Sequence, residues 1–108
     1  MGAQLNYSRI LGPGEFETVP KLIPAVAEAV YVGDCHVVEI QLVNESVAAV
    51  TVTIADKQAT PRAVIPPAIS IPAGTDMIWE FSGRFCPGGI TWVAGTASAV
   101  TGYVRARV

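Results

Sequence analysis

Alternating apolar and polar residues over 33–56 constrain the fold of this chain more than any other feature. In the first half, one set of side chains is expected on one side of a strand and the intervening set on the other: His36, Val38, Ile40 and Leu42 against Val37, Glu39 and Gln41. In the second half the apolar residues are β-branched, which favours strands: Val50, Val52 and Ile54 alternate with Ala49, Thr51 and Thr53. Because the turn formers Asn44, Glu45 and Ser46 lie between the two runs, the sequence predicts a β-hairpin.

The rest of the chain consists of similar short runs separated by proline and glycine. We expect strands over 15–19, 25–32, 62–65, 69–71, 76–82, 90–94 and 97–108, with turns at 83–84 and 86–89. The range 25–32 is ambiguous, because its alanines favour a helix and its alternating valines a strand, and we prefer the strand. About seven to nine short strands with Pro/Gly turns predict an all-β fold, an antiparallel β-sandwich or a jelly-roll-like arrangement.

Residues 1–14 are expected to form an N-terminal arm that precedes a single domain over 15–108. The arm carries four apolar side chains, Leu5, Tyr7, Ile10 and Leu11, and the sequence Gly12-Pro13-Gly14 separates them from the first strand. The arm can pack as an edge strand of its own domain or cross to a neighbouring copy. The sequence leaves both possibilities open, and the four apolar residues are candidate interface residues in the second.

Composition limits the classes of partner. Hydrophobic residues make up 51% of the chain and charged residues only 15%, below the roughly 25% typical of soluble domains, so contacts with neighbouring subunits are favoured. The net charge is −2 with scattered basic residues, so nucleic acid is not an expected partner.

No secretory signal is apparent, which predicts synthesis in the cytoplasm. The uncharged stretch 85–104 is long enough for a membrane helix, but its proline and glycines predict strands, so we expect no membrane span.

No arrangement of residues predicts an enzyme, a cofactor or a metal site. His36 is the only histidine, and the adjacent Cys35 would point to the opposite face of a strand, so the two would not share a metal ion. Glu39 and Glu80 could be offered as an acid/base pair, but solvent-facing strand positions explain them better. Cys35 and Cys86 are expected to be reduced, buried thiols, with a disulfide as the alternative.

The candidate interface residues outside the arm are Trp92, Tyr103, Arg105 and Arg107. Trp92 either packs in the core or forms an aromatic platform that could bind a sugar. Tyr103, Arg105 and Arg107 share one face of a strand, where they could meet an acidic partner or a neighbouring subunit, although a solvated strand face explains them equally well. Trp79 shares a strand face with other large apolar residues and is expected in the core.

Three passages resemble small β-sandwich structural proteins of tailed bacteriophages: YVGDCHVVEIQLVNESVAAVTVTIAD, ISIPAGTDMIWEF and FCPGGITWVAGTASAVTGYVRARV. The similar pattern covers 31–108 and consists of an Asn-containing turn, an A-A-V-T-V-type strand, an I-P-A-G-type turn and a final alternating strand. The resemblance implies a non-enzymatic virion structural protein, made in the host cytoplasm. In its most specific form it implies a capsid decoration (cement) protein that stabilises the phage head through contacts with neighbouring subunits.

The same resemblance implies capsid or other virion proteins as partners and a homo-oligomer, with a trimer as one possible form. The alternatives are a tail or fibre accessory protein and a carbohydrate- or receptor-binding β-sandwich module. No catalytic or binding position is carried over from the resemblance, because its patterns are those of the sandwich itself.

Overall fold

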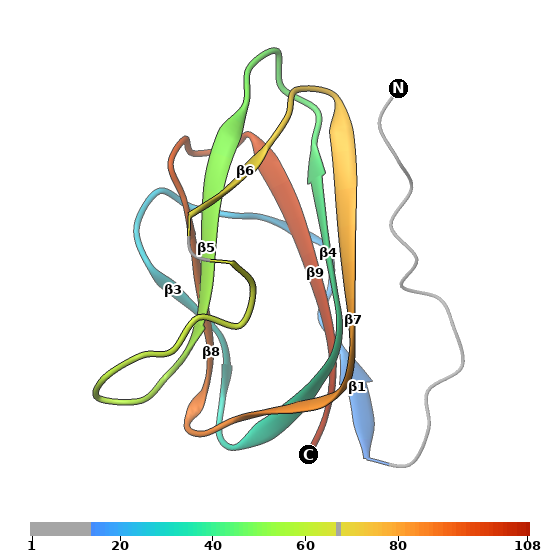
Figure 1. Cartoon of the computed structure of the whole chain (residues 1–108), viewed down its shortest axis with the longest axis vertical. Coiled ribbons are helices and arrows are strands. Elements are labelled where there is room, and N and C mark those ends of the chain that lie inside the picture. The colour runs from blue at the N-terminus through green and yellow to red at the C-terminus, as the bar shows by residue number, and fades with distance from the viewer. Residues whose placement is uncertain (1–13, 67) are drawn as a thin grey trace.

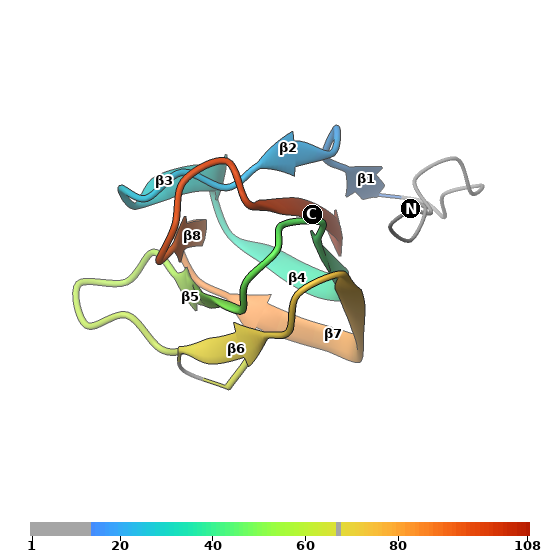
Figure 2. The same ribbon diagram turned by 90° about the horizontal axis from the view of Figure 1, so that it is seen from above.

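The computed structural model describes residues 14–66 and 68–108, which form two antiparallel β-sheets packed face to face (Figures 1 and 2). The strands in chain order are β1 (Glu15–Glu17), β2 (Lys21–Leu22), β3 (Glu28–Val32), β4 (Cys35–Asn44), β5 (Val50–Asp56), β6 (Ile69–Ile71), β7 (Thr75–Cys86), β8 (Gly89–Ala94) and β9 (Val100–Arg107). The predicted all-β sandwich is therefore confirmed. The ambiguous range 25–32 contains strand β3, as preferred, and the predicted turn at 86–89 is also present.

The larger sheet has the strand order β1-β9-β4-β7, and β2 also pairs with β9. The smaller sheet has the order β3-β8-β5-β6. The long strands β4 and β9 therefore lie in the middle of the larger sheet, with β1 and β2 at one edge and β7 at the other. Seen from above, the two sheets form separate layers, with β7 beside β6 at one side of the sandwich (Figure 2).

The predicted hairpin between the two central runs is wrong. β4 pairs with β7 and β9, whereas β5 pairs with β6 and β8, so loop 45–49 crosses from one sheet to the other. Asn44 holds this crossing: its side-chain amide donates to the carbonyl oxygens of Ala48 at 2.9 Å and Ile71 at 2.8 Å. Its Oδ1 accepts from the backbone N–H of Ser46 at 3.0 Å. The predicted turn-forming residues do reverse the chain, but they lead it from the larger sheet to the smaller sheet.

A β-bulge in β4 changes which side chains face the core. The pairing register shifts between Val37 and Glu39 on both sides of the strand. As a result, Cys35 and Val37 lie in the core before the bulge, and Ile40 and Leu42 lie there after it. The predicted alternation is thus correct only after the bulge.

Strand β7 is longer than predicted. It continues through Gly83 and Arg84, where the sequence predicted a turn. Gly83 has a φ of 103°, which favours glycine, and it lies where the register of β4 and β7 shifts. The two strands therefore stay together through the irregularity. The strand predicted at 62–65 is instead a single bridge between Ala63 and Ala55.

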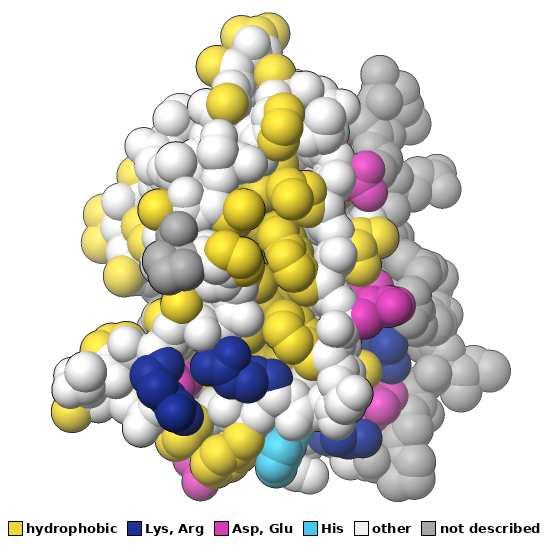
Figure 3. Space-filling model, in the orientation of Figure 1, with side chains coloured by type: hydrophobic (Ala, Val, Ile, Leu, Met, Phe, Trp, Pro, Cys, Tyr) yellow, Lys and Arg dark blue, Asp and Glu magenta, His cyan; other side chains and the backbone are white. Residues whose placement is uncertain are grey.

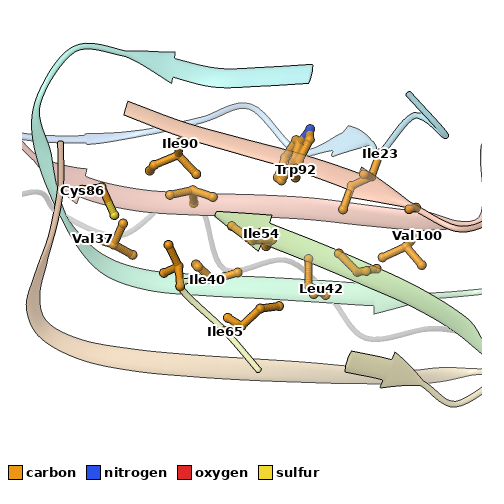
Figure 4. Packing of buried hydrophobic residues seen from close by; sticks show 14 of the residues in the cluster. Ile23, Val37, Ile40, Leu42, Ile54, Ile65, Cys86, Ile90, Trp92 and Val100 are labelled. Atoms are coloured by element: carbon orange, nitrogen blue, oxygen red, sulfur yellow. The ribbon is translucent and has the colours of Figure 1, made fainter. Parts of the chain in front are cut away.

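The core lies between the two sheets and consists mainly of aliphatic side chains (Figure 4). Its largest member from the smaller sheet is Trp92 on β8, which faces Gly102 on β9. A Cβ atom at Gly102 would approach the Trp92 ring to 2.5 Å and Ile23 to 3.0 Å, so the glycine makes room for the indole. The Trp92 Nε1 donates to Glu28 at 3.0 Å. In the part of the chain that the structure describes, no helix is long and apolar enough to cross a membrane.

Candidate functional site: the two edges of the larger sheet

Three predicted interface residues lie on the outer face of the larger sheet. Val104 and Ala106 of β9 are in the core, so the alternating residues Tyr103, Arg105 and Arg107 point to the other face, as predicted. Arg107 is exposed at the end of the strand. The predicted arm residues, Leu5, Tyr7, Ile10 and Leu11, lie outside the described residues.

Trp92 is not a surface residue. Its side chain is only 2% exposed, because Ile90, Trp92 and Ala94 form the inward face of β8. This burial favours the core alternative over the two surface roles considered for Trp92, an interface residue and a platform for sugar. The core alternative holds, and the nearby Gly102 explains how the fold accommodates so large a side chain.

Arg105 is the centre of a buried ionic cluster at the β1 edge. Its Nη1 lies 3.2 Å from Oε1 of Glu15, and its Nη2 lies 3.3 Å from Oε1 of Glu39. Glu39 is only 1% exposed, so the predicted solvent-facing position of this carboxylate is wrong. Because charges interact more strongly away from water, the cluster ties β1 to β4 across β9. The Arg105 guanidinium thus contacts carboxylates of its own chain, and little of it is exposed to a partner.

Tyr103 also contacts a carboxylate of its own chain. Its side chain is 0% exposed, and its hydroxyl donates to Oε2 of Glu17 on β1. Burial, followed by this hydrogen bond, raises the pKa of Tyr103 well above its ordinary value. Tyr103 is therefore a second link between β9 and β1, and its side chain is buried within the chain and not on the surface where an interface residue was predicted.

The opposite edge of the sheet is apolar and open. Met77, Trp79 and Phe81 point from β7 toward the core, as expected for Trp79, but each is only partly buried. The strand that faces β7 across the sandwich, β6, has only 3 residues, so the smaller sheet covers little of β7. Figure 3 shows the result as a continuous strip of hydrophobic side chains between the two sheets. We call Ile69, Met77, Trp79 and Phe81 the open seam.

The loop beside the open seam is fixed by Asp56. This buried carboxylate accepts from the backbone N–H of Arg62 at 3.0 Å and from Nε2 of Gln58 at 2.7 Å. Burial opposes ionisation, but these hydrogen bonds outweigh it and lower the pKa of Asp56. Arg84 of β7 then donates from Nη2 to the carbonyl oxygen of Ala63 at 3.0 Å, which connects the loop to the edge strand.

The two cysteines lie at the end of the β4–β7 pair that includes Cys86, the last residue of β7. Cys35 and Cys86 are directly opposite each other on β4 and β7, and both are free thiols buried as predicted. Burial raises the pKa of both thiols, that of Cys86 to about 11. The neighbouring His36 is exposed on the other face, so Cys35 and His36 do point apart.

The described residues enclose no pocket and hold no group of three potential metal ligands. No family model, curated protein or solved structure that was compared with this chain matches it. The interpretation of the two edges therefore rests on their own geometry.

Proposed function

We propose that this protein is a non-enzymatic structural protein that acts by binding other protein subunits. In its most specific form, it is a capsid decoration protein that stabilises a phage head. The observation that carries the proposal is the open seam, because soluble monomers rarely expose a continuous apolar strip of this kind. Aromatic residues and methionine, which the seam contains, are enriched at the centres of protein interfaces.

Other features of the surface support this role. Several large apolar side chains besides the seam are exposed, among them Ile78 and Phe85 on β7 itself. The low share of charged residues, 15%, fits a surface that is partly covered by neighbours. The virion as the location is supported by the sequence resemblance over 31–108. A tail or fibre accessory protein would use the same seam, so location in the particle separates these two roles.

A carbohydrate-binding module has less support. Sugar sites combine aromatic side chains with precisely placed polar groups. Trp92 is buried, and the partly exposed Trp79 has Met77 and Phe81 as its neighbours on the same face of β7. A surface of this composition suits apolar side chains of another protein better than the hydroxyl groups of a glycan.

The experiment is to locate the chain in assembled particles by electron cryo-microscopy and to compare heat-induced DNA release with and without it. We expect density for this chain at repeated positions on the head, and DNA release at a lower temperature when it is absent. A particle series carrying Trp79→Ser should resemble the depleted particles, whereas Leu22→Ser at the other edge should not. Density confined to the tail would support the accessory role, and particles without the chain would refute both.

A further inference from the structure

Strand β7 is the longest strand edge left open in the part of the molecule that the structure describes. The other edge strands are short: β1 has 3 residues, β2 has 2, β6 has 3, and the 5-residue β3 contains a bulge. Natural sheets protect their edges by shortness, bulges, proline or lysine. β7 has 12 residues, its irregularity lies between Glu80 and Arg84, and its pairing with β4 is regular over 75–80. Over 75–82 it contains neither proline nor lysine. Its backbone is therefore available to pair with another strand.

We propose that β7 pairs in antiparallel fashion with β7 of a second copy, around a twofold axis at Trp79. A twofold axis perpendicular to the sheet keeps the inner faces of both copies on the same side, so the two larger sheets become one continuous sheet. In this register Trp79 lies opposite the partner's Trp79, and Met77 lies opposite the partner's Phe81. The open seams of the two copies then form one apolar strip, which the pairing partly covers.

The charges on β7 select this register. Asp76 and Glu80 both lie on the outer face of the strand. With the axis at Trp79, Glu80 faces the partner's Ile78, and Asp76 faces the partner's Ser82. An axis at Ile78 would place Asp76 opposite the partner's Glu80, and an axis at Glu80 would place that carboxylate opposite its own copy. Directly opposed like charges destabilise strand pairing, so the register centred on Trp79 is favoured among the three.

This inference goes beyond the proposed function, because pairing through β7 requires no capsid and is measured on the purified chain. Ile78 is the position at which to test it. Its side chain is 49% exposed on the outer face, so it is replaceable without opening the core. Leu22 on β2, at the opposite edge of the same sheet, is 50% exposed and provides a matched control.

The test measures the dimer dissociation constant of the full chain by sedimentation equilibrium. Ile78→Glu places a carboxylate opposite the partner's Glu80 at two symmetric positions, and we expect it to weaken the dimer about tenfold or more. Ile78→Lys places an amine there instead, and Leu22→Glu leaves β7 untouched, so both should stay within about threefold of the wild type. The double variant Ile78→Glu/Glu80→Lys restores opposite charges and should recover the affinity. Circular dichroism of each variant establishes that the monomer is folded.

Four results would overturn the proposal. The first is a wild-type chain that stays monomeric up to about 1 mM. The second is an equal loss of affinity in Ile78→Glu and Ile78→Lys, which would indicate a contact without this register. The third is an equal loss in Leu22→Glu. The fourth is a dimer that disappears when residues 1–13 are removed, which would make that segment the occupant of the interface.

Discussion

The two edges of the larger sheet have opposite chemistry. At the β1 edge, the Nη1 and Nη2 atoms of Arg105 contact Glu15 and Glu39, and the buried Tyr103 donates to a third carboxylate, so these charged and polar groups have partners within the fold. At the β7 edge, Met77 and Trp79 are apolar and only partly covered. A buried charge is costly unless the fold itself supplies its partner, whereas an exposed apolar strip is stabilised by whatever covers it. The comparison teaches that the charged edge contributes to the stability of one chain, and it supports our proposal that the apolar edge binds other subunits.

The largest expected effect separates the two tryptophans. Trp92→Ala removes a buried side chain and should lower the free energy of unfolding by about 4 kcal/mol. Trp79→Ala removes a partly exposed one and should cost the monomer only about 1–2 kcal/mol. Urea unfolding at protein concentrations below the dimer range measures both values. Equal losses would mean that the β7 edge is as much a part of the core as β8 is, and the comparison would fail.

The next effect tests the closed edge. Arg105→Ala removes the guanidinium that both Glu15 and the buried Glu39 contact, so the free energy of unfolding should fall by about 3 kcal/mol. Arg107 is exposed on the same strand, and Arg107→Ala should cost less than about 0.5 kcal/mol. Self-association through β7 should be unchanged in Arg107→Ala. Similar losses of stability in the two variants would show that the ionic cluster does not hold the edge.

The smallest effect is a pH dependence of the closed edge. The pKa of Tyr103 is raised in the folded chain above its ordinary value of 10.0, so the neutral phenol stabilises the fold fully below pH 10. As the pH rises above 10, the phenol ionises in the unfolded chain first and this contribution is lost, by up to about 1.4 kcal/mol per pH unit. Tyr103→Phe should cost about 1 kcal/mol at pH 7 and show a shallower loss between pH 10 and 11. Identical alkaline slopes in variant and wild type would contradict this assignment.

Much of the fold could be predicted from the two-residue period, but the pairing of strands could not. The period shows which side chains share a face, yet it does not show which strand lies alongside. Asn44 illustrates the difference: its turn-forming character is local, whereas its bond to the Ile71 carbonyl joins residues from different sheets. The bulge between Val37 and Glu39 was equally hidden, because the residue between them, Val38, is apolar and continues the alternation of Ile40 and Leu42.

The candidate site was harder to predict than the fold. Tyr103 and Arg105 were recognised as sharing a face, but their partners are carboxylates from β1 and β4, which only the strand order brings together. Trp79 was expected in the core, and the signal that it would be partly open was the contrast between the long run 76–82 and the short run 69–71. A three-residue strand cannot cover a strand four times its length, and this inference needs the knowledge that β6 faces β7.

Amide hydrogen exchange of the full chain at low and high protein concentration tests the central claim most directly. If β7 is the edge used for association, exchange over 75–82 should slow as concentration rises, while exchange in β1 and β2 stays the same. The polar side chains at the β1 edge already contact one another within one copy, so we expect no change in amide exchange there when the protein concentration rises. Slower exchange at β1 and β2, or unchanged exchange in β7 across a concentration range in which the chain dimerises, would contradict the account.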